Sequence, residues 1–190
     1  MGIAVAGEEG QKKLRELGVK DSKKLRKTKR KFIYDKIING EASLSYVSYN
    51  QQDSKIIDRT NLNKLEVQMC LSLMHPISHI KDIKFLVDDF TNGSWKRMNF
   101  PNNVRFEIKA DENNIVVAAA SVIAKVKRDE VMKRILDKGG FNQCSGYPAD
   151  EKTVNLLTRY YEEHKKFPPF TRTRWELCKR IVKILEEKNA

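Results

Sequence analysis

Cysteine is scarce in this sequence. The chain of 190 residues has three, Cys70, Cys144 and Cys178, and they stand far apart. An odd count at wide spacing argues against a disulfide framework and against a cysteine-based zinc site, and it favours a reducing compartment. We therefore expect a cytoplasmic protein.

Long hydrophobic runs are also lacking. The longest near-apolar stretch, IVVAAASVIA at residues 115–124, falls well short of the ~20 residues that cross a bilayer. No secretory leader pattern is visible, so we expect no membrane partner. The GxxxxGK[ST] phosphate loop and the GxSxG motif of serine hydrolases are absent too, which removes two common enzyme classes.

Positive charge is abundant. Lysine and arginine number 37 against 25 aspartate and glutamate residues, which leaves a formal net charge of +12. Such an excess favours a polyanionic partner, because each neutralised phosphate releases counterions on binding. An acidic membrane surface is the rival explanation, but it calls for a basic amphipathic helix with large apolar residues, and none is clear.

Hydrophobic periodicity predicts an α/β fold. Alternating or continuous apolar runs indicate strands at residues 2–6, 44–49, 83–87 and 104–108. Spacings of three and four indicate helices, which we place at residues 8–17, 28–38, 62–77, 116–136, 152–164 and 173–187. Strands come early and helices late, which is typical of a sheet with a helical C-terminal part.

Two acidic pairs stand just beyond strand candidates. Asp88 and Asp89 end the run IKFLVDDF, and Asp111 and Glu112 follow the next strand along the chain. Open α/β sheets bind ligands at the carboxyl ends of their strands, and carboxylates that converge there suit Mg²⁺ or Mn²⁺. The plain alternative is that Asp111 or Glu112 stabilises a helix N-terminus.

Two loops offer contacts for a nucleic acid. KDSKK at residues 20–24 combines lysines, a hydroxyl and free backbone N–H groups that can hold a phosphate, although it reads equally as a solvated loop. SGYP at residues 145–148 puts Tyr147 on a turn, where its ring could stack on a sugar or base or simply pack at the surface.

Five segments in order resemble one known family. KDSKKL, VDD, KAD with VVAAASVIAKVKRD, SGYPAD and FPPFTRTRWE are similar to the motifs of type 2 ribonuclease H (ribonuclease HII), in its archaeal form, from about residue 2 to residue 181. The resemblance implies a ribonuclease H-like mixed sheet flanked by helices. It implies a catalytic core at residues 1–138 and a helical region packed on it at residues 139–190.

The resemblance also implies an activity. The family cuts the RNA strand of RNA/DNA hybrids, and single ribonucleotides in DNA, by two-metal-ion hydrolysis that gives a 3′-hydroxyl and a 5′-phosphate. Mg²⁺ or Mn²⁺ would be held by the catalytic carboxylates, and we expect a monomer. The residues that match the family's site are Asp88 and Asp111 for catalysis and metal, Lys20, Ser22, Lys23, Ser121 and Lys125 for phosphates, and Tyr147 for the ribose.

One family motif is missing. The family opens with a strand that carries an Asp-Glu pair followed by Ala-Gly-Arg-Gly, and that strand supplies two of four active-site carboxylates; residues 1–6 here fit the second strand instead. We therefore expect a truncated or mis-started form of the enzyme, catalytically impaired. A non-catalytic binder of hybrids or RNA stays open, as does a basic structural protein of a ribonucleoprotein particle.

Overall fold

The computed structural model describes residues 1–91, 93–141 and 143–188. Internal contacts group them into two compact units. Unit 1 holds residues 1–51 and 63–128, and unit 2 holds residues 52–62 and the rest of the chain from residue 129. The boundary lies ten residues before the end of the expected catalytic core at residue 138, and the division into residues 1–138 and 139–190 stays a prediction.

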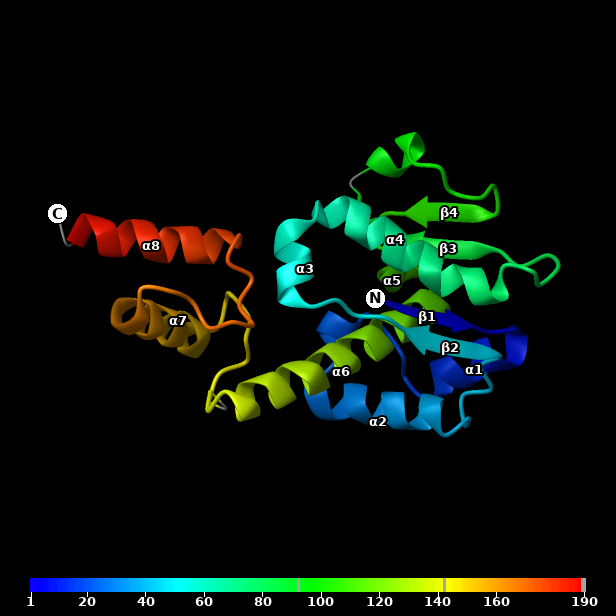
Figure 1. The fold of residues 1–190 in the computed structure, drawn as a ribbon. Coiled ribbons are helices and arrows are strands. Elements are labelled where there is room, and N and C mark those ends of the chain that lie inside the picture. The colour runs from blue at the N-terminus through cyan, green and yellow to red at the C-terminus, as the bar shows by residue number, and fades with distance from the viewer. Residues whose placement is uncertain (92, 142, 189–190) are drawn as a thin grey trace. The chain divides into compact units, whose positions relative to one another are not determined.

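Unit 1 contains two separate two-stranded sheets (Figure 1). β1 (Gly2–Val5) pairs antiparallel with β2 (Tyr46–Tyr49), and β3 (Phe85–Asp88) pairs parallel with β4 (Val104–Glu107). All four strands fall within the runs of apolar and β-branched residues that predicted them, apart from the last residue of β3. Both senses of a mixed sheet are present, but among the described residues no strand joins the two pairs.

Helices cover both faces of β1. Ala4 packs with the cluster built on α6 (Ile115–Lys138), α2 (Lys27–Ile38) and Leu14 of α1 (Glu8–Glu16). The next side chains along the strand, Ile3 and Val5, pack with a second cluster built on α4 (Leu62–Met74), η2 (His75–Ile77) and β3. The period of two along β1 therefore separates a face of small residues from a face of large ones.

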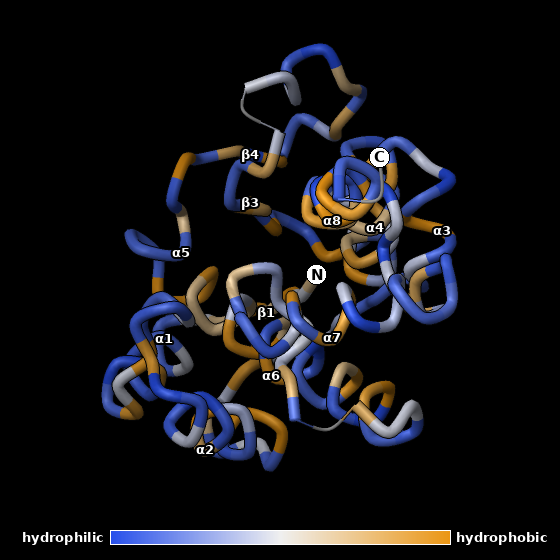
Figure 2. Tube along the Cα trace, turned by 90° about the vertical axis from the view of Figure 1, so that its left-hand side faces the viewer, coloured by the Kyte–Doolittle hydropathy of each residue, from blue (hydrophilic) through white to orange (hydrophobic). Residues whose placement is uncertain are grey.

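Unit 2 is helical. Its cluster of Leu157, Leu177, Ile181 and Leu185 joins α7 (Glu151–His164) to α8 (Glu176–Lys188). Both apolar and polar residues occur around α8, as an amphipathic helix requires (Figure 2). The described residues include no helix long and apolar enough to cross a membrane.

Three short elements have no counterpart among the predicted ones: η1 (Ser22–Lys24), α3 (Ser54–Arg59) and α5 (Ala110–Asn113). A fourth, η3 (Ser94–Arg97), lies between the last two strands, where the sequence predicts a loop with a short helix. Each is too short to show helical periodicity, and each depends on a turn or a contact outside itself. In unit 2, for example, Asp58 of α3 accepts hydrogen bonds from the backbone N–H and hydroxyl of Thr173, at 2.6 and 2.7 Å.

Candidate active site

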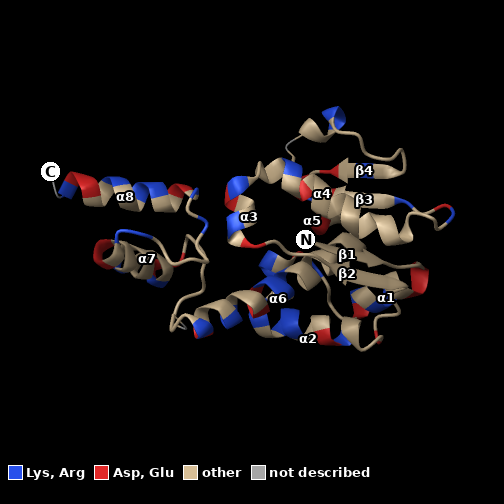
Figure 3. Ribbon diagram, viewed as in Figure 1, with Lys and Arg blue, Asp and Glu red and all other residues tan. Residues whose placement is uncertain are grey.

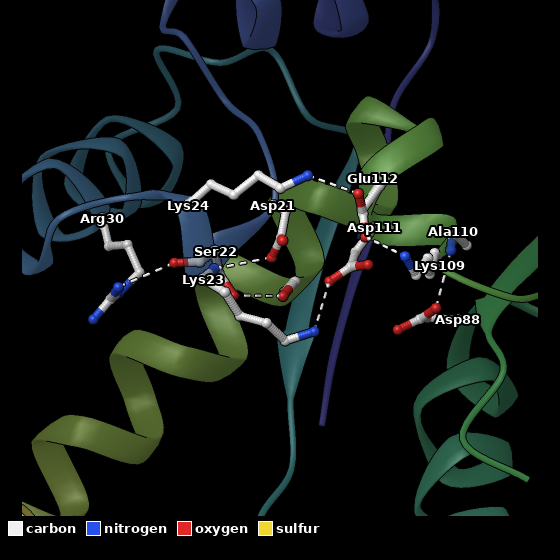
Figure 4. Close-up of polar contacts among 11 residues, drawn as sticks. Asp21, Ser22, Lys23, Lys24, Arg30, Asp88, Lys109, Ala110, Asp111 and Glu112 are labelled. Atoms are coloured by element: carbon white, nitrogen blue, oxygen red, sulfur yellow. Dashed lines mark hydrogen bonds and ion pairs between the residues drawn. The ribbon is translucent and has the colours of Figure 1, made fainter.

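Asp88 is the last residue of β3. Its carboxylate is turned toward the start of α5, where the backbone N–H of Ala110 donates a hydrogen bond to Oδ1 at 2.9 Å (Figure 4). This contact ties the end of β3 to the segment that follows β4, so the two acidic pairs of the sequence meet in space.

A left-handed backbone turn aims Asp111 at the same place. Lys109 has a φ of 57°, a conformation that a residue with a Cβ adopts rarely. α5 begins directly after it, and Asp111 in its first turn is only 5% exposed. Asp88 and Asp111 line one cavity of unit 1, and the charge of Asp111 acts on the carboxyl of Asp88.

The pKa of Asp88 records this proximity. Burial raises the pKa of its carboxyl above the usual value, and the negative charge of Asp111 raises it further. The backbone N–H of Ala110 and the ammonium of Lys23 offset part of the rise. A cation beside the two carboxylates would relieve the repulsion that raises the pKa of Asp88.

Lys23 supplies a cation in this structure. Its Nζ lies 3.7 Å from Oδ2 of Asp111, and its side chain is 78% exposed. The backbone N–H of Lys23 donates to Oδ1 of Asp21 at 2.9 Å, which makes the buried Asp21 the N-cap of η1. The loop that the sequence marks as a phosphate contact thus lies beside Asp111 (Figure 4).

A pair of hydroxyls fixes the same loop on α6. The Oγ atoms of Ser22 and Ser121 are 2.8 Å apart and share a hydrogen bond. Arg30 of α2 donates from Nη1 to the carbonyl oxygens of Ser22 and Leu25, at 3.0 and 2.6 Å. Two residues expected to contact phosphates therefore contact each other.

Glu112 and Asp89 have structural contacts. The carboxylate of Glu112 accepts a hydrogen bond from Lys24 at 2.6 Å and lies 3.4 Å from Nζ of Lys109. Burial alone would raise the pKa of Asp89, but hydrogen bonds from Thr91 and from the backbone of Gly93 hold it below the usual value. These contacts account for both residues without a catalytic role.

The other expected substrate contacts lie in several places. Lys20 is exposed just before η1, and Lys125 is half-buried on α6, one turn after Ser121. Tyr147 belongs to unit 2, where its hydroxyl donates to Oδ1 of Asp129 at 3.1 Å. The ring of Tyr147 is thereby fixed at one end.

Sequence reasoning missed three residues that build the site. They are Asp21, the N-cap of η1; Arg30, which holds the carbonyls of the loop; and Asn114, whose Oδ1 accepts from the backbone N–H of Val116 at 2.9 Å and so caps α6. An Asp or Asn directly before a helical run was the available signal for the two caps. Arg30 gave no local signal, since its partners lie outside its own helix.

Comparison with known proteins identifies the family. The family profile described as "Ribonuclease HII" matches residues 1–178. The chain belongs to the ribonuclease HII family. Ribonuclease HII of Methanococcus maripaludis is 37% identical over 92% of this chain and 77% of its own length, and that of Pyrococcus furiosus is 33% identical over 98% and 85%.

Comparison with solved structures gives the same family. Ribonuclease H2 from Pyrococcus horikoshii matches with a TM-score of 0.75 at 29% identity, over 98% of this chain and 100% of its own. The ribonuclease HII of Archaeoglobus fulgidus, solved in a complex with PCNA, matches with 0.74 at 25%, over 94% and 86%. The prediction of an α/β fold of the ribonuclease H type, in an archaeal form of the family, is confirmed. As a ribonuclease HII, the chain is a hydrolase of the endoribonuclease class that acts on RNA in RNA/DNA hybrids.

Ribonucleases H depend on divalent metal ions, and one fold neighbour at 19% identity, a Bst-RNase HIII, was solved with Mn²⁺. Asp88 and Asp111 offer oxygen donors of the kind such ions take. Within residues 1–91, 93–141 and 143–188, however, no three His, Cys, Asp or Glu side chains come together as a metal-binding group. The donors fit such an ion in chemistry, but two carboxylates fall short of the number of ligands that it needs.

Proposed function

We propose that this chain cuts the RNA strand of hybrids, and single ribonucleotides within DNA, at a site centred on Asp88 and Asp111. The observation that supports it is the convergence of these two carboxylates from β3 and α5, with the raised pKa that their proximity gives Asp88. Two carboxylates held so close that their negative charges repel fit a role in cation binding better than a role in stability.

Asp88 and Asp111 would hold Mg²⁺ or Mn²⁺ with donors from elsewhere. When bound in pairs, such ions supply an activated water and stabilise the leaving oxygen, which leaves a 3′-hydroxyl and a 5′-phosphate. Lys23 can move from Asp111 to a substrate phosphate, because its side chain is mostly exposed. Tyr147 would pack on the ribose, with its hydroxyl oriented by Asp129.

The remaining contacts are to phosphates. Lys20, just before η1, and Lys125, on α6, would add positive charge. Ser22 and Ser121 present hydroxyls that can turn from each other to phosphate oxygens. The excess of lysine and arginine on the chain supports this role, and Figure 3 shows these residues recurring along α2, α6 and α8.

A cleavage assay tests the proposal. The chain is incubated with an RNA/DNA hybrid, a DNA duplex with one ribonucleotide, an all-DNA duplex and an all-RNA duplex, with Mn²⁺, with Mg²⁺ and with EDTA. We expect metal-dependent cutting confined to the first two. Asp111→Asn should remove it, and the neighbouring exposed acid provides a matched control, Glu112→Gln, that should keep it.

A second candidate function is binding of hybrids without cutting. The shortage of metal donors favours it. Its signature is tight, salt-sensitive binding of hybrid with no product at any metal concentration. A monomeric state and a cytoplasmic location stay predictions; size-exclusion chromatography with light scattering checks the first.

A further inference from the structure

Unit 2 contains a cavity of its own. Its volume is about 390 Å³, and its walls are one side of α7 and the loop that precedes this helix. All of the lining residues lie between positions 141 and 163, so the whole cavity belongs to unit 2. Sites for small ligands span ~300–1,000 Å³, which means that this unit 2 cavity holds a small molecule or one unit of a polymer.

One wall of the unit 2 cavity is aromatic. The ring of Phe141 packs edge-on against Tyr160, with centroids 5.9 Å apart, and at 5.7 Å against Phe170. The backbone N–H of Phe141 donates to the carbonyl oxygen of Leu136 at 2.7 Å, and a Cβ on Gly139 would lie 2.8 Å from the ring. These contacts fix the ring in place, so the wall offers a preformed surface to a planar ligand.

Two cations stand at the opposite wall. Lys152 and Arg159 are seven residues apart on α7, which puts them on one side of the helix, two turns from each other. Both are exposed, and neither forms an ion pair with any residue that the structure describes. The described lining includes a single acid, Glu163, which lies 3.8 Å from Nε2 of His164. The unneutralised positive charge favours an anion, and phosphate is the anion that Arg and Lys commonly hold.

Two side-chain amides complete the lining. Asn155 lies between the two cations along α7, and Gln143 comes from the loop. Both side chains are exposed and present a donor and an acceptor in one plane. Amides of this kind pair with the edge of a nucleobase, which also carries donors and acceptors in one plane.

We propose that the unit 2 cavity binds one unpaired nucleotide. The base lies against the aromatic wall of Phe141 and Tyr160, its edge meets the two amides, and its phosphate lies at the two cations. A free nucleotide and a nucleotide of a single strand carry the same groups, and both fit. A nucleotide inside a duplex does not fit, because its base is stacked between neighbours and its edge is already paired.

Other anions use less of the unit 2 cavity. Inorganic phosphate contacts the cations and leaves the aromatic wall uncovered. An acidic peptide supplies carboxylates but no planar face for the ring of Phe141. A nucleotide alone matches all three features, since stacking on an aromatic side chain and a charge-assisted contact to phosphate act on the same molecule.

Cys144 serves as a probe of occupancy. It lines the unit 2 cavity and is half-buried, whereas Cys70 and Cys178 are buried. The full chain is treated with iodoacetamide, and alkylation of each cysteine is followed by mass spectrometry. Each of the four ribonucleoside 5′-monophosphates, adenosine, inorganic phosphate, a single-stranded oligonucleotide of mixed sequence and a blunt DNA duplex is added in turn, without metal.

Alkylation of Cys144 should report the ligand. A mononucleotide or the single strand should slow it by about fivefold or more, because a bound ligand blocks access to the thiol. Adenosine, inorganic phosphate and the duplex, at the same concentration, should slow it by less than about twofold. The rates at Cys70 and Cys178 should stay unchanged, which shows that the effect is local.

Charge variants test the phosphate contact. Lys152→Gln combined with Arg159→Gln should weaken binding of the nucleotide or single strand, measured by calorimetric titration, by about tenfold or more. The matched control is Arg180→Gln combined with Lys188→Gln, which removes the same charge from exposed positions of α8 outside the cavity. The control should change the affinity by less than about threefold.

A filling variant tests the space itself. Asn155→Trp places a large side chain in the unit 2 cavity from an exposed position of α7 and should abolish binding. Glu162→Trp makes a similar change at an exposed position of α7 outside the cavity and should keep it. Should Asn155→Trp fail to fold, the charge variants and the alkylation of the unaltered chain still decide.

The outcomes are distinct. Protection of Cys144 by mononucleotides supports the site with a small-molecule ligand, and protection by the single strand alone supports it with a strand as the source of the nucleotide. Protection by neither, protection by inorganic phosphate or the duplex to the same degree, or equal loss of affinity in the charge variants and their control overturns the proposal. No readout depends on cutting, so failure of the proposed nuclease leaves this result unchanged.

Discussion

Asp111 is bordered by two regions that differ in how their polar groups are satisfied. On the loop side, side chains from η1, α5 and α6 bond one another, as in the Ser22–Ser121 and Lys24–Glu112 pairs, and Arg30 of α2 donates to backbone carbonyls of the loop. On the cavity side, strand edges face a cavity, and Asp88 has a raised pKa. Polar contacts between neighbouring segments therefore complete the first region, whereas in the second a carboxyl with a raised pKa lines an open cavity.

The largest expected effect concerns the acids that both regions share. Asp111→Asn or Asp88→Asn should reduce Mn²⁺ affinity and hybrid cleavage by more than ~100-fold, since even the loss of a residue that supports a metal ligand costs about 10–100-fold. Calorimetry with Mn²⁺ measures the first quantity. Unchanged metal affinity in both variants would remove these residues from the site.

On the loop side, the hydrogen bond between Ser22 and Ser121 can be removed by substitution. Ser22→Ala or Ser121→Ala alone should lower the free energy of unfolding by about 1–3 kcal/mol, because each leaves a partner hydroxyl with its hydrogen bond lost. The double variant should cost less than the sum of the two. Urea unfolding of the four proteins measures this coupling; additive losses would mean that the bond contributes nothing.

On the cavity side, removing the charge of Asp88 should raise stability, whereas the serine substitutions on the loop side lower it. The folded-state pKa of Asp88 lies above its unfolded value, so its ionised form costs stability at pH 7. This cost fades as the pH falls through the folded-state pKa and is gone below the unfolded pKa. Asp88→Asn should therefore raise the Tm at pH 7, by a few °C at most, and not at pH 3. Calorimetric scans at both pH values check it, and a lower Tm at pH 7 would contradict it.

The smallest effect is expected at the exposed pair of Lys24 and Glu112. Lys24→Ala should change the free energy of unfolding by less than ~1 kcal/mol, because water and salt screen an exposed ion pair. Denaturation at low and high salt measures it. A loss of stability above ~1 kcal/mol would show that the Lys24–Glu112 ion pair is needed to hold the loop. The ion pair would then matter about as much as the Ser22–Ser121 hydrogen bond.

The sequence predicted most of the long elements and the acids of the site. Periodicity placed the four strands and the long helices because each has an apolar face that its own residues mark, as Leu65 and Leu73 mark α4. Strand ends pointed to both acidic pairs, and the resemblance to the family singled out the acids at 88 and 111. Short elements such as η1 and α5 escaped, because they depend on a cap by Asp21 and on a left-handed Lys109.

By itself, then, the sequence determined the family and the class of reaction, since both follow from residue types in order along the chain, and it supplied the two carboxylates as a prediction. Tertiary structure alone decided that Lys23 lies at Asp111, that Ser22 bonds Ser121, and that β1 and β3 face a cavity. The physical reason is that a hydrogen bond, an ion pair or an unpaired strand edge depends on which distant segments meet. The residue pattern within one segment does not specify which segments those are.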